Sequence, residues 1–581
     1  MKFDVLAKSF QQLESTSKRL EKTHIISSLL KETDDDHLQP VLLLLRGQIY
    51  PDFDQRDIGI SNKLAIKAMN TAFGYSEDDI KNKWREIGDL GEIAKELSTN
   101  KKQNTLFQKD LNVKNIFKTL QELPRFTGHG STDQKIKQIS KLLGHAKPLE
   151  AKYITRIVLQ DLRVGIAEGT IRDGMAWAYL DEVKPHYDEK QKSITPKNRE
   201  KYNEAIELIQ DCLNKTNDFY QVAKATKKGI NELQKIDLQI GKPLKSMLAK
   251  RSKNAKDAFD TTGRPSALEY KYDGLRMQIH YKDEKVQIFT RRLDDVTKQF
   301  PEVQRYVKEN VNCTNCILDA EAVGYNSKTK KYTKFQEISQ RIKRKYDIKK
   351  LSKKIPVELN IFDILYHNNE SQIKKTYQER RQLLEKIITK KPLQIVPAKQ
   401  IITKEISKAQ EFFEQALNEG NEGLMFKKLD AIYKPGNRVG YMVKYKTHLD
   451  DLDLVITGAE WGTGKRKGWL TSLLVSCYNQ ELQTFEEIGK VGTGLKEKGD
   501  EGTTFQEITN QLKKYITKTT NREVTITPKI VISVRFEEIQ KSTAYTSGYA
   551  LRFPRFKQLR PDRKPESIAT KKEVKQAYQN Q

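Results

Sequence analysis

The stretch EYKYDGLRMQIH, from Glu269 to His280, decides how the middle of this chain folds. An Asp-Gly turn divides it. After the turn, apolar and polar residues alternate from Leu275 to Tyr281, which is typical of a β-strand with one core face and one polar face. Before the turn, Glu269 and Lys271 share a face if the segment is extended. A lysine beside a carboxylate, immediately before a turn, is a candidate reactive group.

The same spacing of two residues recurs further along the chain. Asp319 and Glu321 share a face in ILDAEAVGY, as do Lys444 and Lys446 in MVKYK, and Glu422 precedes an apolar run. For any single pair, a solvated outer face is the alternative. Burying several such faces without partners is very costly. The repetition within one region therefore favours convergence on a cleft, with cations for phosphate and carboxylates for a divalent metal.

Length and charge narrow the class of protein. The chain has 581 residues, which predicts roughly three domains, each with its own core. Lys and Arg number 105 against 77 acidic residues, a net charge of +28. Such a chain suits a polyanionic partner, nucleic acid first, because neutralised phosphates release counterions. The alternative is that the lysines serve solubility alone.

Several classes are disfavoured by what the sequence lacks. It has no run of about 18 apolar residues, so no membrane span is expected, and its N-terminal sequence does not resemble a secretory signal. The four cysteines include one CxxC, Cys313 and Cys316, without the second pair that a zinc site needs. We interpret them as reduced packing residues in an intracellular, cytoplasmic protein.

The chain changes character along its length, which predicts a multidomain α and α+β protein. Residues up to about 226 have helical periodicity, 236–446 alternate short strands with charged helices, and the remainder has short strands with glycine turns. We expect an all-helical domain at 1–232, an α+β domain at 233–448 and a small β-barrel at 449–581. The glycine-rich stretch 458–466 does not fit the Walker spacing, and we interpret it as a barrel hairpin that carries a tryptophan.

Seven segments occur in an order that resembles the motif series of ATP-dependent DNA ligases of the archaeal and eukaryotic replicative type. They are KYDGLR (271–276), FTRRLDDVT (289–297), LDAEAV (318–323), NIFDILY (360–366), EGLMFK (422–427), VKYK (443–446) and ALRFPRFKQLRPDR (550–563). The helical third, with RFTGHGSTDQKIKQISKLL, is similar to the DNA-binding domain of that family. The resemblance covers essentially the whole chain, and it implies a nucleotidyltransferase middle domain and a C-terminal OB-fold barrel.

The resemblance also implies a mechanism. The amine of Lys271 attacks the α-phosphorus of ATP, expels pyrophosphate and holds AMP as a phosphoramidate, for which it must be neutral. The AMP passes to the 5′-phosphate of a nick in duplex DNA, and the 3′-hydroxyl then seals the strand. Mg²⁺ is the expected metal, with Mn²⁺ as a possible substitute. DNA replication, repair and recombination are the expected settings.

The other site residues follow by position in the motifs. Each role is one that the resemblance implies: Glu269 at the adenine, Arg276 and Arg291 at the ribose and phosphates, Glu321 and Glu422 at the ribose or metal, Phe362 stacked on adenine, Arg438 as a further basic position, Lys444 and Lys446 at the α-phosphate, and Arg560, Asp562 and Arg563 at the pyrophosphate.

Two features depart from the family or extend it. Arg563 stands where a lysine is usual, and Tyr441 and Met442 stand where tryptophan is common. Arginine keeps the charge but not the geometry. The segment QNTLF, with Gln103, Leu106 and Phe107, resembles the sliding-clamp-binding sequence of archaeal ligases; an ordinary loop is the alternative.

These observations predict a monomeric ATP-dependent DNA ligase that acts on nicks. An NAD-dependent ligase is disfavoured, because its four-cysteine zinc module and nicotinamide-binding segment are not visible. The large helical domain disfavours an RNA-capping or RNA-ligating enzyme. A catalytically silent DNA-binding scaffold fits the charge but does not explain the lysine and carboxylates.

Overall fold

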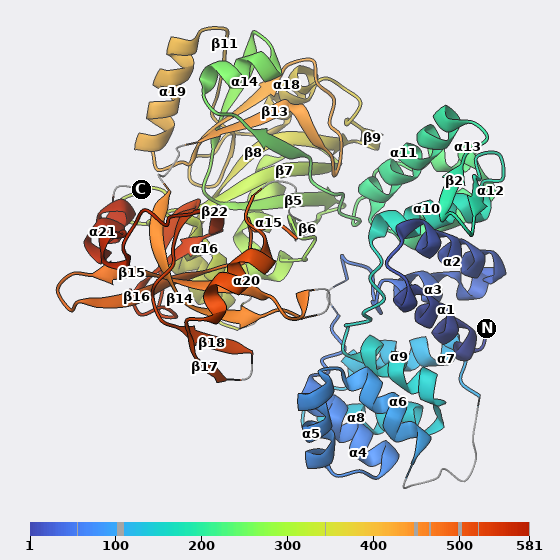
Figure 1. The fold of residues 1–581 in the computed structure, drawn as a ribbon. Helices are drawn as coiled ribbons and strands as arrows, with labels where there is room; N and C mark the ends of the chain where they lie inside the picture. The colour runs from blue at the N-terminus through green and yellow to red at the C-terminus, as the bar shows by residue number, and fades with distance from the viewer. Residues whose placement is uncertain are drawn as a thin grey trace. The chain divides into compact units, whose positions relative to one another are not determined.

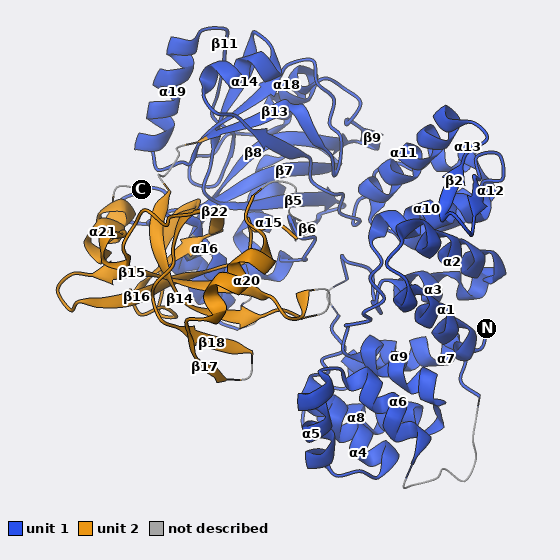
Figure 2. Cartoon of the chain, viewed as in Figure 1, with its two compact units in different colours: residues 1–445 blue, residues 446–581 orange. Residues whose placement is uncertain are grey.

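A computed structural model describes residues 1–579 apart from 55, 102–109, 343, 345, 447–450, 464–465, 498–501 and 521. It divides into two compact units, residues 1–445 and 446–581, which Figure 2 colours separately. The predicted boundary between 232 and 233 lies inside the first unit and stays a prediction. The predicted boundary between 448 and 449 lies outside the described residues.

The N-terminal region of the first unit is helical, as predicted (Figure 1). One difference is a short hairpin of β1 (His186–Asp188) and β2 (Ser193–Thr195). The Asp188 carboxylate accepts hydrogen bonds from the amides of Lys190 and Gln191 and so closes the turn, a local signal that helical periodicity does not detect. The helices are α1 (Phe3–Ser15), α2 (Arg19–Glu32), α3 (Asp35–Leu45), α4 (Asn62–Phe73), α5 (Glu77–Ile87), α6 (Leu90–Thr99), α7 (Val113–Glu122), α8 (Ser131–His145), α9 (Pro148–Val158), α10 (Glu168–Tyr179), α11 (Arg199–Thr216), α12 (Phe219–Lys228) and α13 (Ile230–Gln234).

Ion pairs stabilise buried charged side chains in the helical region. Arg156 of α9 is 3% exposed, and its guanidinium lies 2.9 Å from Glu14 of α1 and 2.6 Å from Asp89 beside α6. Burying an arginine without such partners would be strongly destabilising. The network therefore connects three helices of one apolar core.

A five-stranded sheet carries Lys271 at the end of one of its inner strands. Its order is β11-β4-β12-β13-β3, and Lys271 is the last residue of β4. The sheet packs with α14 (Ala255–Thr262) and α19 (Ile406–Asn418) around one apolar cluster. Its strands are β3 (Leu248–Arg251), β4 (Ser266–Lys271), β11 (Gln400–Thr403), β12 (Gly423–Lys428) and β13 (Arg438–Lys446).

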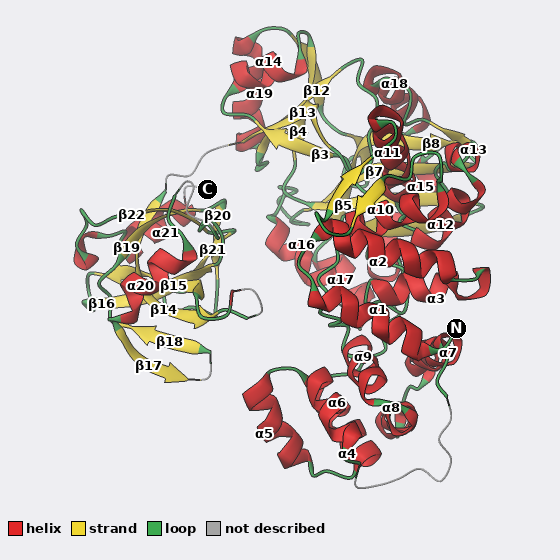
Figure 3. Cartoon of the chain, turned by 45° about the vertical axis from the view of Figure 1, so that its right-hand side comes forward, coloured by secondary structure: helices red, strands yellow, loops and turns green. Residues whose placement is uncertain are grey.

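A second sheet begins directly after the Asp-Gly turn. Its order is β10-β8-β7-β5-β6, with β9 beside β8. Figure 3 labels β5, β7 and β8 of this sheet. The predicted strand is β5, and its apolar face joins the core of this sheet. The strands are β5 (Leu275–Lys282), β6 (Lys285–Thr290), β7 (Asn315–Gly324), β8 (Val357–His367), β9 (Glu370–Ser371) and β10 (Ile395–Pro397), and the helices are α15 (Pro301–Asn310), α16 (Phe335–Ile342), α17 (Ile348–Lys354) and α18 (Tyr377–Ile387).

The polar face of β5 is buried rather than solvated. Gln278 is 5% exposed and His280 is fully buried. The amide of Leu244 donates to Gln278 Oε1, and the amide of Gly241 donates to His280 Nδ1. The segment with Gly241 and Leu244 therefore covers this face and forms hydrogen bonds with its polar side chains. Burial lowers the pKa of His280 to about 3.

The second unit is β-rich, as predicted, and encloses its own apolar cluster. The long strand β14 pairs with β15, β18 and β19, and β19 also pairs with β22. The tryptophan-bearing stretch 458–466 begins in β14, which ends at Trp461, and β14 pairs with β15 in antiparallel fashion, which agrees with a hairpin; 464–465 are outside the described residues. The elements are β14 (Leu452–Trp461), β15 (Leu470–Asn479), β16 (Thr484–Val491), β17 (Ile516–Thr520), β18 (Glu523–Ile526), β19 (Val531–Arg535), β20 (Glu538–Lys541), β21 (Tyr549–Arg552), β22 (Arg555–Leu559), α20 (Phe505–Lys513) and α21 (Lys571–Gln579).

Within the described part of the chain, every helix is too short or too polar to cross a bilayer.

Candidate active site

Lys271, the last residue of β4, is paired with a carboxylate. Its Nζ is 2.7 Å from Glu422 Oε2, and its side chain is about one-fifth exposed. The backbone supports this pairing, because the amide of Glu422 donates to the carbonyl of Lys271 at 2.8 Å and β12 begins beside it. The structure therefore brings together two residues far apart in sequence that both belong to the predicted site.

Arg276 is held on the polar face of β5 by a buried carboxylate. Its Nε and Nη2 lie 2.9 Å and 2.6 Å from the two oxygens of Asp319, which is fully buried. Tyr433 donates to Asp319 Oδ2 at 3.0 Å, and Arg276 donates to the carbonyl of Met247. Burial disfavours the guanidinium charge, but the Asp319 carboxylate outweighs it and raises the pKa of Arg276. The two-point pairing fixes the plane of this guanidinium.

Glu321 is surrounded by the other charged members of the site. The antiparallel register of β5 and β7 places it opposite Arg276. Exclusion of water raises the pKa of the Glu321 carboxyl to about 8. The charges of Lys271 and Arg276 oppose that rise, and the carboxylate of Glu422 adds to it. The sequence-predicted residues of β4, β5, β7 and the start of β12 thus form one electrostatic cluster.

Two further arginines extend the cationic side of this cluster. Arg291 follows β6 and Arg438 begins β13. Burial lowers the pKa of Arg291, and the nearby charges of Arg276 and Arg438 lower it further. Three guanidinium groups that repel one another in this way form a region of positive potential suited to phosphate.

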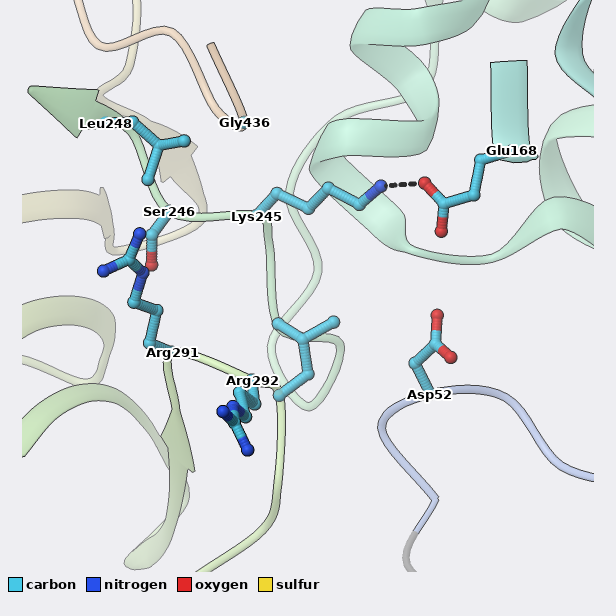
Figure 4. A pocket seen from close by; sticks show the side chains of 9 residues that line it. Asp52, Glu168, Lys245, Ser246, Leu248, Arg291, Arg292 and Gly436 are labelled. Carbon is cyan, nitrogen blue, oxygen red and sulfur yellow. Dashed lines mark hydrogen bonds and ion pairs between the residues drawn. The ribbon is translucent and has the colours of Figure 1, made fainter. Parts of the chain in front are cut away.

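A cavity of about 410 Å³ opens beside Arg291 (Figure 4). Arg292, Lys245 and Ser246 also line it, and Glu168 of the helical region forms an ion pair with Lys245. The helical region therefore contributes side chains to the surroundings of the predicted site.

Glu269 is buried next to Phe362. Its exposed fraction is 2%, and Lys427 Nζ lies 2.5 Å from its Oε2. The same ammonium group lies 5.0 Å from the centre of the Phe362 ring, and the guanidinium of Arg276 lies 5.3 Å from it. Glu269 and Phe362 thus contact the same ammonium group, and their roles at the adenine stay predictions.

Lys444 and Lys446 have different surroundings. Lys444 lies on β13, where its carbonyl accepts from the amide of Ser252. Lys446 is the first residue of the second unit, and its Nζ lies 3.0 Å from the Glu537 carboxylate. Their predicted contact with the α-phosphate stays a prediction.

The C-terminal motif residues lie together at the end of β22. Arg560 Nη1 is 2.6 Å from Asp453 and its Nη2 is 2.7 Å from Asp562; Arg563 Nε is 3.5 Å from Asp453. The hydrogen bond from Arg560 lowers the pKa of Asp562 to about 2. The predicted clamp-binding residues Gln103, Leu106 and Phe107 lie outside the described residues.

The cysteines carry free thiols, and in the described ranges no cluster of three or more His, Cys, Asp or Glu side chains is arranged to hold a metal.

Sequence reasoning missed residues that position the site. Tyr433 anchors Asp319, and Tyr377 and Gln400 contact Glu269. All three come from segments outside the motif cores, so only their proximity in the fold reveals them. Lys427 is the last residue of EGLMFK, but no sequence pattern indicates its pairing with Glu269.

A helical region, a two-sheet region with a lysine paired with a carboxylate, and a β-rich unit define a multidomain nucleotidyltransferase. Three family models match the chain: DNA ligase N terminus over 2–176, ATP dependent DNA ligase domain over 246–446, and ATP dependent DNA ligase C terminal region over 466–563. The chain belongs to the ATP-dependent DNA ligase family. The predicted enzyme class, a DNA ligase that uses ATP, is confirmed.

Similar proteins agree with this assignment. A DNA ligase of Nanoarchaeum equitans is 45% identical over the whole chain and 99% of its own length. Those of Thermococcus onnurineus and Methanopyrus kandleri are 38% and 37% identical, also over the whole chain and over 98% and 99% of their lengths. A solved structure titled Pmar-Lig_PreS3 is 18% identical, covers 95% of this chain and 99% of its own, and has a TM-score of 0.57, which supports the fold.

Proposed function

We propose that Lys271 is the residue that becomes adenylylated when this ligase reacts with ATP. The observation that carries the proposal is the ammonium group of Lys271 2.7 Å from Glu422, inside the cluster that also holds Arg276 and Glu321. The amine must lose its proton to solvent before it attacks, because only the neutral nitrogen is a nucleophile. The nitrogen then forms a bond to the α-phosphorus, and the bond from that phosphorus to the pyrophosphate oxygen breaks.

Different residues would contact the base, the ribose and the phosphates of the nucleotide. Glu269 and Phe362 hold the base, Arg276 holds the ribose, and Arg291 and Arg438 face the phosphates. Lys444 and Lys446 contact the α-phosphate, and Arg560, Asp562 and Arg563 contact the departing pyrophosphate. The support for the base and ribose roles is the contact chain from Glu269 through Lys427 to Phe362 and Arg276.

Glu321 and Glu422 would hold the magnesium ion. Two carboxylates with substrate phosphates and water fit Mg²⁺, which is commonly held by one or two protein carboxylates. The Glu422 carboxylate raises the pKa of Glu321, which supports the closeness of the two side chains. When bound, the ion neutralises charge that develops on the phosphate oxygens.

The substrate is duplex DNA with a nick. The AMP on Lys271 moves to the 5′-phosphate, and the 3′-hydroxyl then displaces AMP to form the phosphodiester. We propose domains at 1–232, 233–448 and 449–581 that grip the backbone without reading sequence, as a monomer in the cytoplasm. The net charge of +28 supports binding to phosphates.

Intact-mass spectrometry after incubation with ATP, GTP, NAD or no nucleotide tests the assignment. We expect the parent and a Lys408→Ala control to gain the mass of one AMP from ATP, and Lys271→Ala to gain none. Lys271→Ala should still seal a nick that already carries AMP on its 5′-phosphate, since that step does not need the lysine. An adduct of normal yield in Lys271→Ala would remove the proposal.

We also propose that Gln103, Leu106 and Phe107 bind a sliding clamp. Their support is the sequence pattern alone, since a short apolar anchor suits a pocket on a partner. The double substitution Leu106→Ala with Phe107→Ala should weaken binding to the cognate clamp in surface plasmon resonance at least about tenfold, against a Thr105→Ala control. Equal binding by the two variants would contradict the proposal.

A further inference from the structure

The carboxylate of Glu269 is enclosed by donors from three elements. Tyr377 donates its hydroxyl to Oε1, Gln400 donates Nε2 to the same oxygen at 3.1 Å, and Arg381 Nη1 lies 3.4 Å from it. Lys427 Nζ lies 2.5 Å from the other oxygen, Oε2. Tyr377 is 3% exposed, so these are interior contacts.

Sheet register produces this arrangement. Gln400 of β11 is the direct partner of Glu269 on β4, so their side chains share a face. Lys427 of β12 is two residues beyond Met425, the partner of Glu269 on the other side, and so shares that face too. Tyr377 and Arg381 are four residues apart on α18 and project from one side of the helix.

The two oxygens of Glu269 are therefore not equivalent. A carboxylate oxygen accepts about two hydrogen bonds. Oε1 receives two hydrogen bonds, from Tyr377 and Gln400, which fill it, and a longer contact of 3.4 Å from Arg381; among the described residues Oε2 contacts Lys427 alone. The Tyr377 hydroxyl remains a donor, because burial and the Glu269 charge raise its pKa well above the usual value. One acceptor position remains, on Oε2, beside an ammonium donor.

We propose that Tyr377 and Gln400 are positioning residues that set the base preference of the nucleotide site, by occupying Oε1 so that Glu269 offers a purine only one acceptor. The proposal rests on the proposed role of Glu269 at the base.

Adenine and guanine differ on the edge that would meet this carboxylate. Adenine presents one amino group beside a ring nitrogen that accepts, which matches an acceptor on Oε2 next to the Lys427 donor. Guanine presents a carbonyl oxygen and, beyond it, two adjacent donors that suit a carboxylate with both oxygens available. A site with one open acceptor thus accepts adenine and leaves one guanine donor without a partner, which is costly on burial.

Removing a donor to Oε1 should therefore relax selectivity rather than only weaken binding. Tyr377→Phe keeps the ring and removes the hydroxyl, and Gln400→Met keeps the length and removes the amide. In each variant Oε1 becomes available to a second donor of guanine. We expect the ratio of kcat/KM for Lys271 modification by ATP to that by GTP to fall by about tenfold in each variant.

Inosine triphosphate separates this explanation from general loosening of the pocket. It shares the carbonyl and the ring N–H of guanine but lacks the exocyclic amino donor, so its kcat/KM relative to that of ATP should rise less than that of GTP does. Tyr270→Phe is the matched control: its hydroxyl bonds Glu419 at 3.1 Å, it lies next to Glu269 on β4, and it should leave the ATP to GTP ratio unchanged.

The readout is the yield and rate of the Lys271 adduct by intact mass, on full-length protein whose melting temperature has been compared with the parent. Gln400 lies on the edge strand β11 and is partly exposed. If Gln400→Met reacts with ATP as the parent does but has a lowered ATP to GTP ratio, the proposal is supported even if Tyr377→Phe folds poorly. Ratios within about twofold of the parent in the folded variants would overturn it and leave the function of Lys271 intact. Absence of any adduct in the parent would overturn the proposed function and this inference together.

Discussion

Gly274 lies where the turn after Lys271 passes close to β7. A Cβ atom there would be 2.5 Å from the carbonyl oxygen of Ala322 and 2.9 Å from Cγ of Glu321. Real side chains do not approach backbone that closely, so Gly274→Ala must displace the turn, the strand or Glu321. We expect a loss of about 1–3 kcal/mol in stability and a slower Lys271 adenylylation.

Urea unfolding and single-turnover adduct formation measure these two effects. Gly440→Ala is the matched control, since the nearest atoms to its added Cβ lie at 3.9 Å and 4.0 Å, ordinary contact distances. Parent-like rates in Gly274→Ala would mean that the turn moves without disturbing the site.

The raised pKa of Glu321 makes the stability of the protein depend on pH. Its pKa is about 8 in the folded protein against 4.5 for an ordinary glutamate, so the folded state holds this proton more tightly than the unfolded state does. The contribution to stability is then complete below about pH 4.5 and is lost as pH rises towards 8. Glu321→Gln, which stays neutral, should gain in melting temperature relative to the parent from pH 5 to pH 8.

Melting temperatures of both proteins in one buffer series measure that difference. Above pH 8 the difference should level off. A difference that is constant across the range would show that the Glu321 carboxyl titrates normally.

At the scale of elements, a buried ion pair attaches α18 to β8. Arg380 Nε lies 2.7 Å from Asp363 Oδ1, Arg380 Nη2 lies 3.0 Å from Oδ2, and both side chains are almost fully buried. Arg380→Leu leaves the Asp363 carboxylate without its cation, which should destabilise the protein by about 3–5 kcal/mol. Because α18 also carries Tyr377 and Arg381, selectivity for ATP should fall as well.

Denaturant unfolding measures the stability change. The exposed pair Lys399–Glu419, at 2.8 Å, is the control, and Lys399→Ala should cost only about 0–1 kcal/mol. Similar losses of stability in Arg380→Leu and Lys399→Ala would contradict the claim that burial makes the Arg380–Asp363 pair important.

How far the sequence predicts the fold depends on the range of the interactions. The alternation after the Asp-Gly turn correctly indicated β5, and the motifs indicated Lys271, Glu321 and Glu422, because these signals are local. The covering of Gln278 and His280 was not predictable, since the covering segment is held by hydrogen bonds that only the fold creates.

The same limit applies to the site. Asp319 shares a strand with Glu321, so its place was expected, but its bond to Tyr433 joins segments that no periodicity connects. Tyr377 and Gln400 likewise reach Glu269 through sheet register and helix packing.

At the scale of the whole molecule, charge and family agree on a DNA substrate. The family models match parts of both compact units and both regions of the first, so each region belongs to one ligase architecture. The cavity beside Arg291 is lined by Lys245 and Glu168, whose ion pair joins the helical region to the rest of the first unit.

The net charge of +28 predicts that binding to nicked duplex DNA weakens steeply with salt. Each neutralised phosphate contributes a slope of about −0.9 to the dependence of log K on log salt concentration, so a grip on 6–10 phosphates would lower affinity by about 10³–10⁵ between 50 and 200 mM. Fluorescence anisotropy with labelled nicked duplex measures this. Lys271 adenylylation without DNA serves as the control and should change far less, because only one nucleotide is bound. A shallow slope for the duplex would mean that most of the basic surface lies away from the DNA, and that the excess of lysine serves solubility instead.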